Sequence, residues 1–306
     1  MAITAQQVKE LREMTGAGMM DCKNVLVETD GDMDRAVELL REKGLAKAAK
    51  KAGRVAAQGI VKVNFTNDGK SASIIEVNSE TDFVAKNEEF LEFVGNLANL
   101  ALEKEFAELE AFMSHVYEGE GTVQDALNNK IARIGENMNI RRFERFAEPG
   151  CVYAGYTHGA GTIGVVVGFK SDASADEISV MGKDVAMQVA SMNPKFLRES
   201  DVDADYIETE KKILTQQVLN EGKAPEMVGK IVDGKIKKEL KEVCLVEQKF
   251  VKDNEMTVKQ YIESVAKELG KPIEIVSMIR YEVGEGIEVE QEDFATEVAK
   301  QMAAKA

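Results

Sequence analysis

The sequence predicts an α+β fold: an N-terminal three-helix module, two similar subdomains of antiparallel sheet plus helix, an inserted helical hairpin and a C-terminal helix. Two observations carry this prediction. β-Branched runs that flank a glycine-containing turn, followed by a long amphipathic helix, occur twice along the chain. The stretch before the first copy and the stretch 203–242, which interrupts the second, show helical spacing of apolar residues and no strand pattern. With 306 residues and 44% apolar content, the chain can fill two or three compact cores.

The first unit, residues 1–54, is expected to contain three short helices. Thr4 and Gln7 form a capping box before a helix whose inward face is Val8, Leu11 and Met14. The glycines of TGAGMM turn the chain into a second helix, DCKNVLVE. Asp32 is the expected N-cap of the third helix, with a buried stripe of Ala36, Val37 and Leu40 and a C-terminal cap at Gly44. The alanine-rich residues 45–56 are interpreted as a helical linker.

Residues 55–150 are expected to form the first sheet-plus-helix subdomain. IVKVNF and SASIIEV flank an Asn-Asp-Gly turn, as in an antiparallel hairpin. A loop, TDFVAKN, leads into a helix whose apolar residues recur at helical spacing: Phe90, Phe93, Val94, Leu97 and Leu100. A second helix is predicted from Val123 to Gly135, and NMNIRRFERFAE then returns to strand.

The second subdomain is expected to comprise residues 151–202 plus 243–283. VYAGYTH and IGVVVGFK flank the glycine-rich turn GAGT, and a helix from Ser174 to Met192 follows. Its inward residues are predicted to be Ile178, Met181, Val185 and Val189. The subdomain resumes with EVCLVEQKFV as a strand, TVKQYIESVAKELG as a helix and PIEIVSMIRYEV as a strand.

The β pattern disappears between these two parts, in residues 203–242. Apolar residues at helical spacing predict two helices joined by EGKAP, with seams of Ile207, Leu214 and Val218 and of Val228, Val232, Ile236 and Leu240. Each arm would extend about 25 Å at ~1.5 Å per residue. Such a hairpin either packs on the body or meets a partner. Residues 284–306 close the chain with an amphipathic helix, DFATEVAKQMAAKA.

Composition limits the location and the partners. The net charge of −15 makes direct binding of nucleic acid or an anionic membrane unfavourable. The one locally basic stretch, Lys47 to Arg54, is interpreted as the solvated face of a helix rather than an RNA contact. Three widely spaced cysteines without a CxxC motif fit a reducing compartment. Without a signal core or a long apolar run, the chain is expected to be cytoplasmic.

The chain offers few catalytic groups. It contains two histidines and lacks GxSxG, HExxH and GxxxxGK[ST] motifs, so we expect no catalytic residue, no metal site and no cofactor. A nucleophile pair of Cys22 and His158 stays open as an alternative, although no neighbouring motif activates it. GAGMMDCK lies between helices rather than after a strand, which disfavours phosphate binding.

Apolar residues in turns are the stronger candidates for function. Met19 and Met20 follow a glycine turn, and one small core cannot hold both, so we expect one of them to be exposed. Phe83 lies between an aspartate and VAKN. It is a buried plug, a contact at the start of the next helix, or a side chain presented to a partner.

TGAGMMDCKN and NSETDFVAKNEEF resemble two signature stretches of the elongation factor Ts family, nucleotide-exchange factors for elongation factor Tu. The similarity continues through IARIGENMNIRR, YTHGAGTIGVVV and IRYEVGEGIE in the same order. The resemblance implies a ubiquitin-associated-like N-terminal module. It implies the same order of units along the chain that the spacing of apolar residues predicts. It also implies that the chain binds elongation factor Tu, disturbs its Mg²⁺ and phosphate site, and promotes GDP release. No bond is made or broken in that process, so the resemblance implies a protein that is not an enzyme.

The resemblance also assigns contact residues. Asp82 and Phe83 fall on the pair that inserts between two helices of the partner's GTPase domain, within a motif loop that also contains Thr81, Val84, Ala85, Lys86 and Asn87. Other implied contacts are Met19, Met20, Lys23, Ile134 and His158. The final helix, from Asp293, is implied to reach the GTPase domain from another side. The 203–242 hairpin either contacts other domains of the partner or forms a homodimer.

Two other classes of function compete with exchange. An adaptor would use residues 1–54 alone for recognition and would not need Phe83. A metabolic enzyme would turn over a small molecule, which the scarcity of histidine and of phosphate-binding motifs disfavours.

Overall fold

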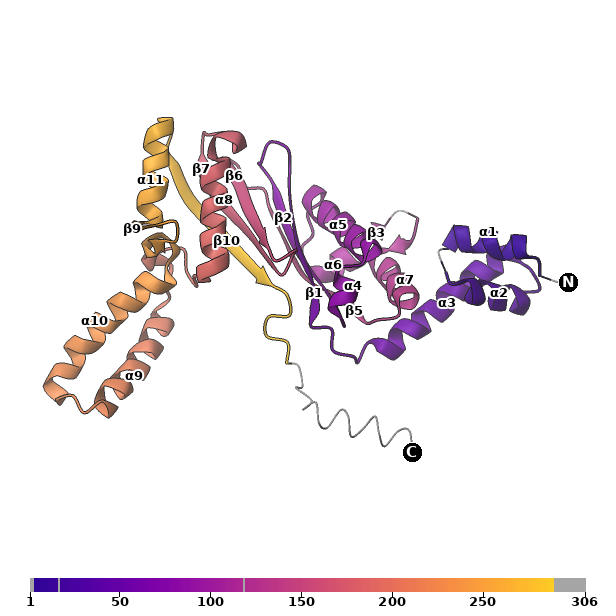
Figure 1. Cartoon of the computed structure of the whole chain (residues 1–306), viewed down its shortest axis with the longest axis horizontal. Helices are drawn as coiled ribbons and strands as arrows, with labels where there is room; N and C mark the ends of the chain where they lie inside the picture. Colours follow the sequence, from indigo (N-terminus) through magenta and orange to yellow (C-terminus); the bar gives the residue numbers. More distant parts are fainter. Residues whose placement is uncertain (1–2, 16, 118, 289–306) are drawn as a thin grey trace.

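The computed structural model describes residues 3–15, 17–117 and 119–288. The chain is elongated, with a helical module at one end, two sheets in the middle and a helical hairpin at the other end (Figure 1). The predicted α+β class, with its N-terminal helices and antiparallel sheets, is confirmed. The predicted C-terminal helix from Asp293 lies outside the described residues.

The N-terminal module contains α1 (Ala5–Thr15), α2 (Met19–Glu28) and α3 (Met33–Lys51). The Thr4–Gln7 capping box is present, with hydrogen bonds of 3.0 and 3.2 Å. The core is small: Val8, Leu11, Cys22, Val25, Leu26 and Ala36. Met14, which we expected to face inward, is 60% exposed, because the core of three short helices is already closed around Leu11, one turn earlier.

The predicted C-terminal cap at Gly44 is wrong, because α3 continues through this residue to Lys51. The following alanine-rich sequence favours the helix and outweighs the cost of about 1 kcal/mol for one interior glycine. Gly44 is buried, and the carbon atom that a side chain would add lies 3.7 Å from the Cβ of Ala132. This helix joins the module to α7 (Val123–Ile134) of the central part.

Gly44→Ala is expected to stabilise α3 by about 0.5–1 kcal/mol, because the added methyl group makes ordinary van der Waals contacts and removes the glycine penalty. Hydrogen exchange of the α3 amides measures this gain. Gly234→Ala, in α10 (Pro225–Val243) with open space around the added carbon, is the reference. Faster exchange in Gly44→Ala, with slower exchange in Gly234→Ala, would contradict the expected fit between α3 and α7.

The central part contains two three-stranded antiparallel sheets of the same topology. The first has the order β1 (Gln58–Phe65), β2 (Ala72–Ser79) and β5 (Met138–Phe146). The second has the order β6 (Cys151–His158), β7 (Ile163–Ser171) and β10 (Ile273–Glu282). In each sheet the third strand pairs with the second strand of the hairpin after a helical excursion. The predicted similarity of the two subdomains is therefore present in the strand order.

The two sheets lie between helices. The first sheet is covered by α5 (Glu88–Glu103), and the second by α8 (Ala175–Met192), which starts at the N-cap Ser174. The sheets pack on each other through Val61, Ala72, Ile74, Cys151, Tyr153, Val166 and Tyr281. The packing is close, because a carbon atom added at Gly164 would lie 2.4 Å from the Cγ1 of Val61. The layers therefore run helix, sheet, sheet, helix.

Two sequence predictions fail in the smaller elements. EVCLVEQKFV is not one strand: α10 runs to Val243, a 3₁₀ turn covers Leu245–Glu247, and β8 is only Lys249–Phe250. Short apolar runs are equally compatible with burial outside a strand, and Cys244 and Leu245 are fully buried. TDFVAKN is not wholly loop, because it contains the one-turn helix α4 (Asp82–Ala85).

Of the remaining elements, the helix α11 (Val258–Leu269) was predicted. The smaller ones were not predicted: α6 (Leu109–Met113), β3 (Val116–Tyr117), β4 (Gly121–Thr122), a 3₁₀ turn (Glu199–Asp201) and β9 (Asp253–Thr257). The arms of the hairpin, α9 (Ala204–Asn220) and α10, enclose their own seam of Leu214, Val218, Val228, Val232, Ile236 and Leu240. The hairpin projects from the body (Figure 1). None of the described helices combines the length and the apolar character needed to cross a membrane.

Glu76 is the central charge where the two subdomains meet. It is fully buried in β2 and lies 3.1 Å from Arg141 and 2.6 Å from Arg142. The amide N–H of Gly284 and the side chain of Asn78 also donate to it, at 2.8 and 3.0 Å. Burial alone would raise the pKa of Glu76, but these hydrogen bonds and the charge of Arg142 together hold it below its ordinary value. The network joins β2 to the end of β10.

A pH dependence of stability follows from Glu76. The pKa of this carboxyl is lower in the folded chain than its ordinary 4.5, so the unfolded chain binds the proton more readily and acid favours unfolding. Its stabilising contribution is complete above pH 4.5 and is lost as the pH falls through the folded pKa. Thermal melts between neutral and acidic pH measure the effect. Glu76→Gln should reduce the acid slope, and equal slopes in both proteins would contradict this assignment.

Candidate partner-binding site

Phe83 stands out from the surface on a short, well-anchored turn. Its side chain is 81% exposed, whereas the next two residues, Val84 and Ala85, are each 8% exposed and belong to the first core. Thr81 caps α4 by accepting a hydrogen bond from the N–H of Val84 at 3.4 Å. The buried-plug and helix-contact alternatives for Phe83 are therefore excluded. We refer to residues Thr81–Asn87 as the Phe83 turn.

The surface of the Phe83 turn carries an ion pair. Asp82 and Lys86 lie one helical turn apart, with 2.6 Å between carboxylate oxygen and Nζ, and both side chains are more than half exposed. A hydrogen bond from Lys86, together with its positive charge, lowers the pKa of Asp82. Asn87 ends the turn by capping α5 with hydrogen bonds from the amides of Glu89 and Phe90. Asp82 therefore remains ionised beside the exposed ring.

The loop between α7 and β5 supports the Phe83 turn from the side. Glu136 accepts hydrogen bonds from Thr81, from the N–H at 3.0 Å and from Oγ1 at 2.7 Å. Lys51, at the end of α3, donates to the carbonyl oxygen of Gly135. Ile134 is half-buried and packs against the first core, so it lies near this support with only part of its side chain accessible.

His158 is exposed at the end of β6, where its Nδ1 lies 3.0 Å from the Tyr156 hydroxyl. The β6–β7 turn contacts the first sheet, because the N–H of Val61 donates to the carbonyl of Gly161 at 2.7 Å. β1 starts at Gln58, which pairs with Ser79 at the end of β2, just before the Phe83 turn. His158 is therefore presented at the same end of the paired sheets as Phe83.

The structure rules out the pairing of Cys22 with His158. Cys22 is fully buried in the core of the N-terminal module, whereas His158 is exposed at the end of the second sheet. Burial raises the pKa of the Cys22 thiol, which opposes formation of a reactive thiolate. Among the described residues, no group of three or more His, Cys, Asp or Glu side chains is arranged to hold a metal ion.

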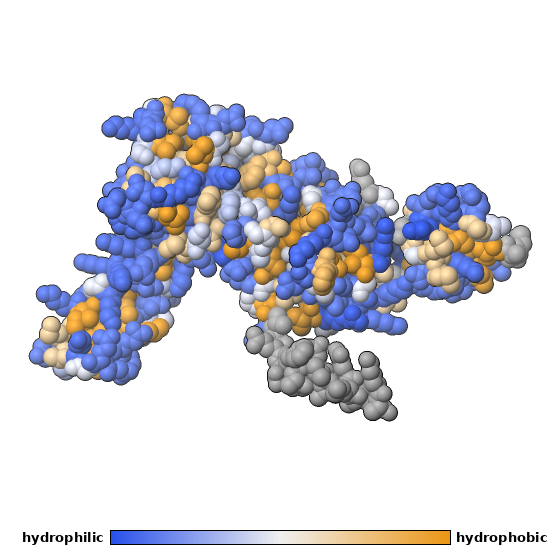
Figure 2. Space-filling model, in the orientation of Figure 1, coloured by the Kyte–Doolittle hydropathy of each residue, from blue (hydrophilic) through white to orange (hydrophobic). Residues whose placement is uncertain are grey.

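Met19 and Met20 form a second exposed apolar region, on α2. They are 60% and 63% exposed, so both methionines are accessible rather than one. Lys23, one turn further on, is also exposed, and Val27 continues the face at 57% exposure. Apolar side chains are visible on the surface of this module (Figure 2). The module lies apart from the Phe83 turn and is joined to the body by α3 (Figure 1).

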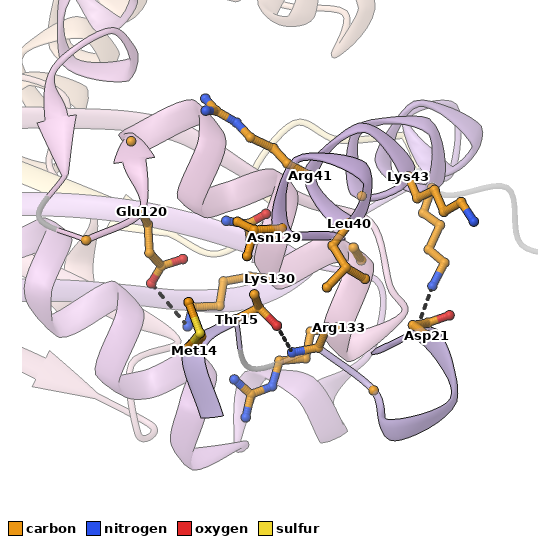
Figure 3. A pocket seen from close by; sticks show the side chains of 18 of the residues that line it. Met14, Thr15, Asp21, Leu40, Arg41, Lys43, Glu120, Asn129, Lys130 and Arg133 are labelled. Atoms are coloured by element: carbon orange, nitrogen blue, oxygen red, sulfur yellow. Dashed lines mark hydrogen bonds and ion pairs between the residues drawn. The ribbon is translucent and has the colours of Figure 1, made fainter. Parts of the chain in front are cut away.

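The hollow between the module and the body has mixed charge (Figure 3). Lys47 pairs with Asp21 across α2 and α3 at 2.8 Å, and Lys130 lies 3.8 Å from Glu120. Basic side chains of α3 thus make contacts within the chain, Lys47 with Asp21 and Lys51 with the carbonyl of Gly135. Arg41 of α3, which also lines the hollow, pairs with Asp125 of α7 at 2.6 Å, so an ion pair joins the module to the body here.

Sequence reasoning missed the polar residues that hold the Phe83 turn. Glu80, Glu136 and Asn137 were not singled out, although they lie within or beside the stretches that carried the family resemblance. Glu136 lies in the short loop before β5, where no repeating sequence pattern indicates that its carboxylate holds another segment. Its partner lies 55 residues away in the sequence, and only the folded chain brings the two together.

The fold and the site define a class: an α+β protein that presents an exposed phenylalanine on a short supported turn and exposed methionines on a surface helix. The family model for elongation factor TS matches residues 80–285. Elongation factor Ts of Clostridioides difficile (strain 630) is 54% identical over 300 residues, covering 98% of this chain and 99% of the relative. Elongation factor Ts of Clostridium perfringens (strain SM101 / Type A) is 53% identical over 298 residues, covering 97% and 98%. The chain belongs to the elongation factor Ts family.

Proposed function

We propose that this chain is a guanine-nucleotide exchange factor that binds elongation factor Tu and promotes the release of GDP during translation elongation. The single observation that carries the mechanism is the 81% exposure of Phe83 on an anchored turn. The ring enters between helices of the partner's GTPase domain, with ionised Asp82 beside it. Movement of those helices disturbs the loops that hold the nucleotide's phosphates and Mg²⁺.

Binding linkage explains why this insertion releases nucleotide. A factor that binds the nucleotide-free partner more tightly must, by reciprocity, weaken nucleotide binding by the same factor. Burial of one Phe side chain contributes about 1.5–3 kcal/mol, which is one to two factors of ten. A shift of 10⁴ requires about 5.5 kcal/mol. We therefore assign additional contacts to Met19, Met20 and Lys23 and, at the end of the sheets, to Ile134 and His158.

The proposed partner is a protein, and the chain acts on it by contact rather than by covalent chemistry. A net charge of −15 favours a protein as the partner over nucleic acid or an anionic membrane. We propose that the chain acts in the cytoplasm, where translation elongation takes place. Phe83 lies outside residues 1–54, which favours exchange over an adaptor function that needs the N-terminal module alone. We further propose the division into 1–54, 55–150, 151–202 plus 243–283, 203–242 and 284–306.

The hairpin has two proposed uses, contact with other domains of elongation factor Tu or pairing with a second copy of this chain. Its main apolar seam is enclosed between its own arms, so either partner must use the outer faces, where Ile213, Leu219 and Met227 are exposed. Sedimentation of the chain alone shows whether it pairs with a second copy.

The exchange proposal is tested by the release of fluorescent GDP from elongation factor Tu. The full chain should accelerate release at concentrations far below that of the partner, as a catalyst of exchange does. Release at the spontaneous rate, at every concentration of the chain, would reject the proposal.

A further inference from the structure

Three segments that are distant in sequence meet behind the Phe83 turn. Glu136 accepts two hydrogen bonds from Thr81, and in return Glu80 accepts one from the N–H of Asn137. We call this reciprocal pair of contacts, made by Glu80, Thr81, Glu136 and Asn137, the double clasp. Asn137 also donates through its side chain to the carbonyl of Arg54, at 2.7 Å. The Arg54 guanidinium lies 3.4 Å from Glu80, which ties the clasp to the segment that follows α3.

The Phe83 turn cannot hold its own orientation. α4 has four residues, far fewer than a helix needs to be stable without tertiary contacts. Phe83 buries little of its ring against the body, and the buried Val84 and Ala85 anchor the turn through small side chains. The double clasp restrains the start of the turn, directly before the ring, together with the hydrogen bond that the Ser79 hydroxyl donates to the carbonyl of Thr81 at 3.0 Å.

We propose that Glu136 is a positioning residue for exchange, which holds the Phe83 ring in the orientation that enters the partner. Through Asn137 and Arg54, the same clasp fixes that orientation relative to α3 and hence to the exposed face of Met19 and Met20. This inference rests on the proposed function for its consequence, but the restraint itself is a property of the free chain. Pre-ordering of the ring lowers the cost of its immobilisation on binding.

The restraint can be measured in the free chain, because the sequence contains no tryptophan. Phe83→Trp places a single fluorescent reporter on the turn, and its emission anisotropy reports the mobility of the ring. In this background, Glu136→Gln and Thr81→Val should lower the anisotropy, because the first replaces a charged acceptor of both hydrogen bonds by a neutral amide and the second removes the hydroxyl that makes one of them. Thr81→Ser keeps the hydroxyl and should retain the anisotropy. Unchanged anisotropy in both Glu136→Gln and Thr81→Val would overturn the proposal, whatever the chain does to elongation factor Tu.

The consequence is measured as factor-stimulated GDP release in chains that retain Phe83. A hydrogen bond to a charged group corresponds to about a tenfold change in an equilibrium, so Glu136→Gln and Thr81→Val should each lower exchange efficiency about tenfold. Thr81→Ser should remain within about twofold of the parent, which a general loss of packing would not produce. Glu92→Gln, on the exposed face of α5 and with the same change of charge, is the control.

The two failures are distinguishable. If the parent chain does not stimulate GDP release, the proposed function fails, and the anisotropy alone decides whether Glu136 restrains the ring. If the parent is active and Glu136→Gln frees the ring without slowing exchange, the positioning role is overturned. Circular dichroism melts within about 2 °C of the parent confirm that each variant is folded, since a surface change of this kind is expected to cost little global stability.

Discussion

Phe83→Ala should slow factor-stimulated GDP release by roughly ten- to a hundredfold, because the removed ring would contribute about 1.5–3 kcal/mol when buried in the partner. Its 81% exposure in the free chain means that folding gains little from it, so the melting temperature should stay close to that of the parent. Stopped-flow release of fluorescent GDP and a thermal melt of the same preparation provide both measurements.

The control for this variant is Val180→Ala, which trims a 71%-exposed apolar side chain on α8, outside the described site. It should leave both exchange and melting unchanged. A Phe83→Ala chain that exchanges at the parent rate would remove the ring from the mechanism. A large fall in melting temperature, in contrast, would mean that the ring is part of the chain's own core, against its exposure.

Local signals in the sequence predicted most of the fold. The inward residues Ile178, Met181, Val185 and Val189 place α8 correctly, because a 3.6-residue period is contained within one segment. Gly135 ends α7 in the left-handed conformation at φ 92°, as a helix-ending glycine should. Where a single local rule sufficed, the prediction was confirmed.

Predictions failed where the deciding contact is distant in sequence. Gly44 carries the local signal of a helix end, but the packing of α3 on α7 and the alanines beyond it extend the helix. EVCLV carries the apolar pattern of a strand, but Cys244 and Leu245 are buried with only an isolated bridge between Cys244 and Phe196, and Leu245 belongs to the core of the second sheet. Apolar content specifies burial, and the geometry of that burial depends on neighbours that no window of sequence contains.

In the candidate site, too, local features could be predicted from the sequence and contacts between distant residues could not. The motif located Asp82 and Phe83, yet spacing alone left Phe83 open as plug, helix contact or exposed side chain. Exposure became definite only because Val84 and Ala85, the two residues after it, take the inward positions. The double clasp could not be predicted, because Thr81 and Glu136 are 55 residues apart, and Asn137 and Arg54 are 83 residues apart.

Glu76→Gln should be strongly destabilising, because it removes a buried charge that joins β2 to β5 and to the amide of Gly284 after β10. The carboxylate is fully buried and receives hydrogen bonds or ion pairs from Arg141, Arg142, Asn78 and the amide of Gly284. Removing one member of a buried ionic network costs about 3–5 kcal/mol, because the remaining charges stay partly desolvated. Hydrogen exchange of amides in β2, β5 and the end of β10 should accelerate by more than about a hundredfold.

Comparison with an exposed pair tests whether burial is the cause. Glu13 lies 3.6 Å from Lys9 with its side chain 68% exposed, so Glu13→Gln should change stability by less than about 1 kcal/mol. A double-mutant cycle with Arg142→Gln adds a second criterion. Because Glu76 and Arg142 share one hydrogen bond, the double variant should lose less free energy of unfolding than the sum of the two single variants. Additive losses, or a Glu76→Gln effect no larger than that of Glu13→Gln, would mean that the pair of the buried Glu76 with Arg142 contributes little to stability. A shared loss would show that Glu76 and Arg142 act as one unit between β2 and β5, where Glu76 also accepts a hydrogen bond from the amide N–H of Gly284 after β10.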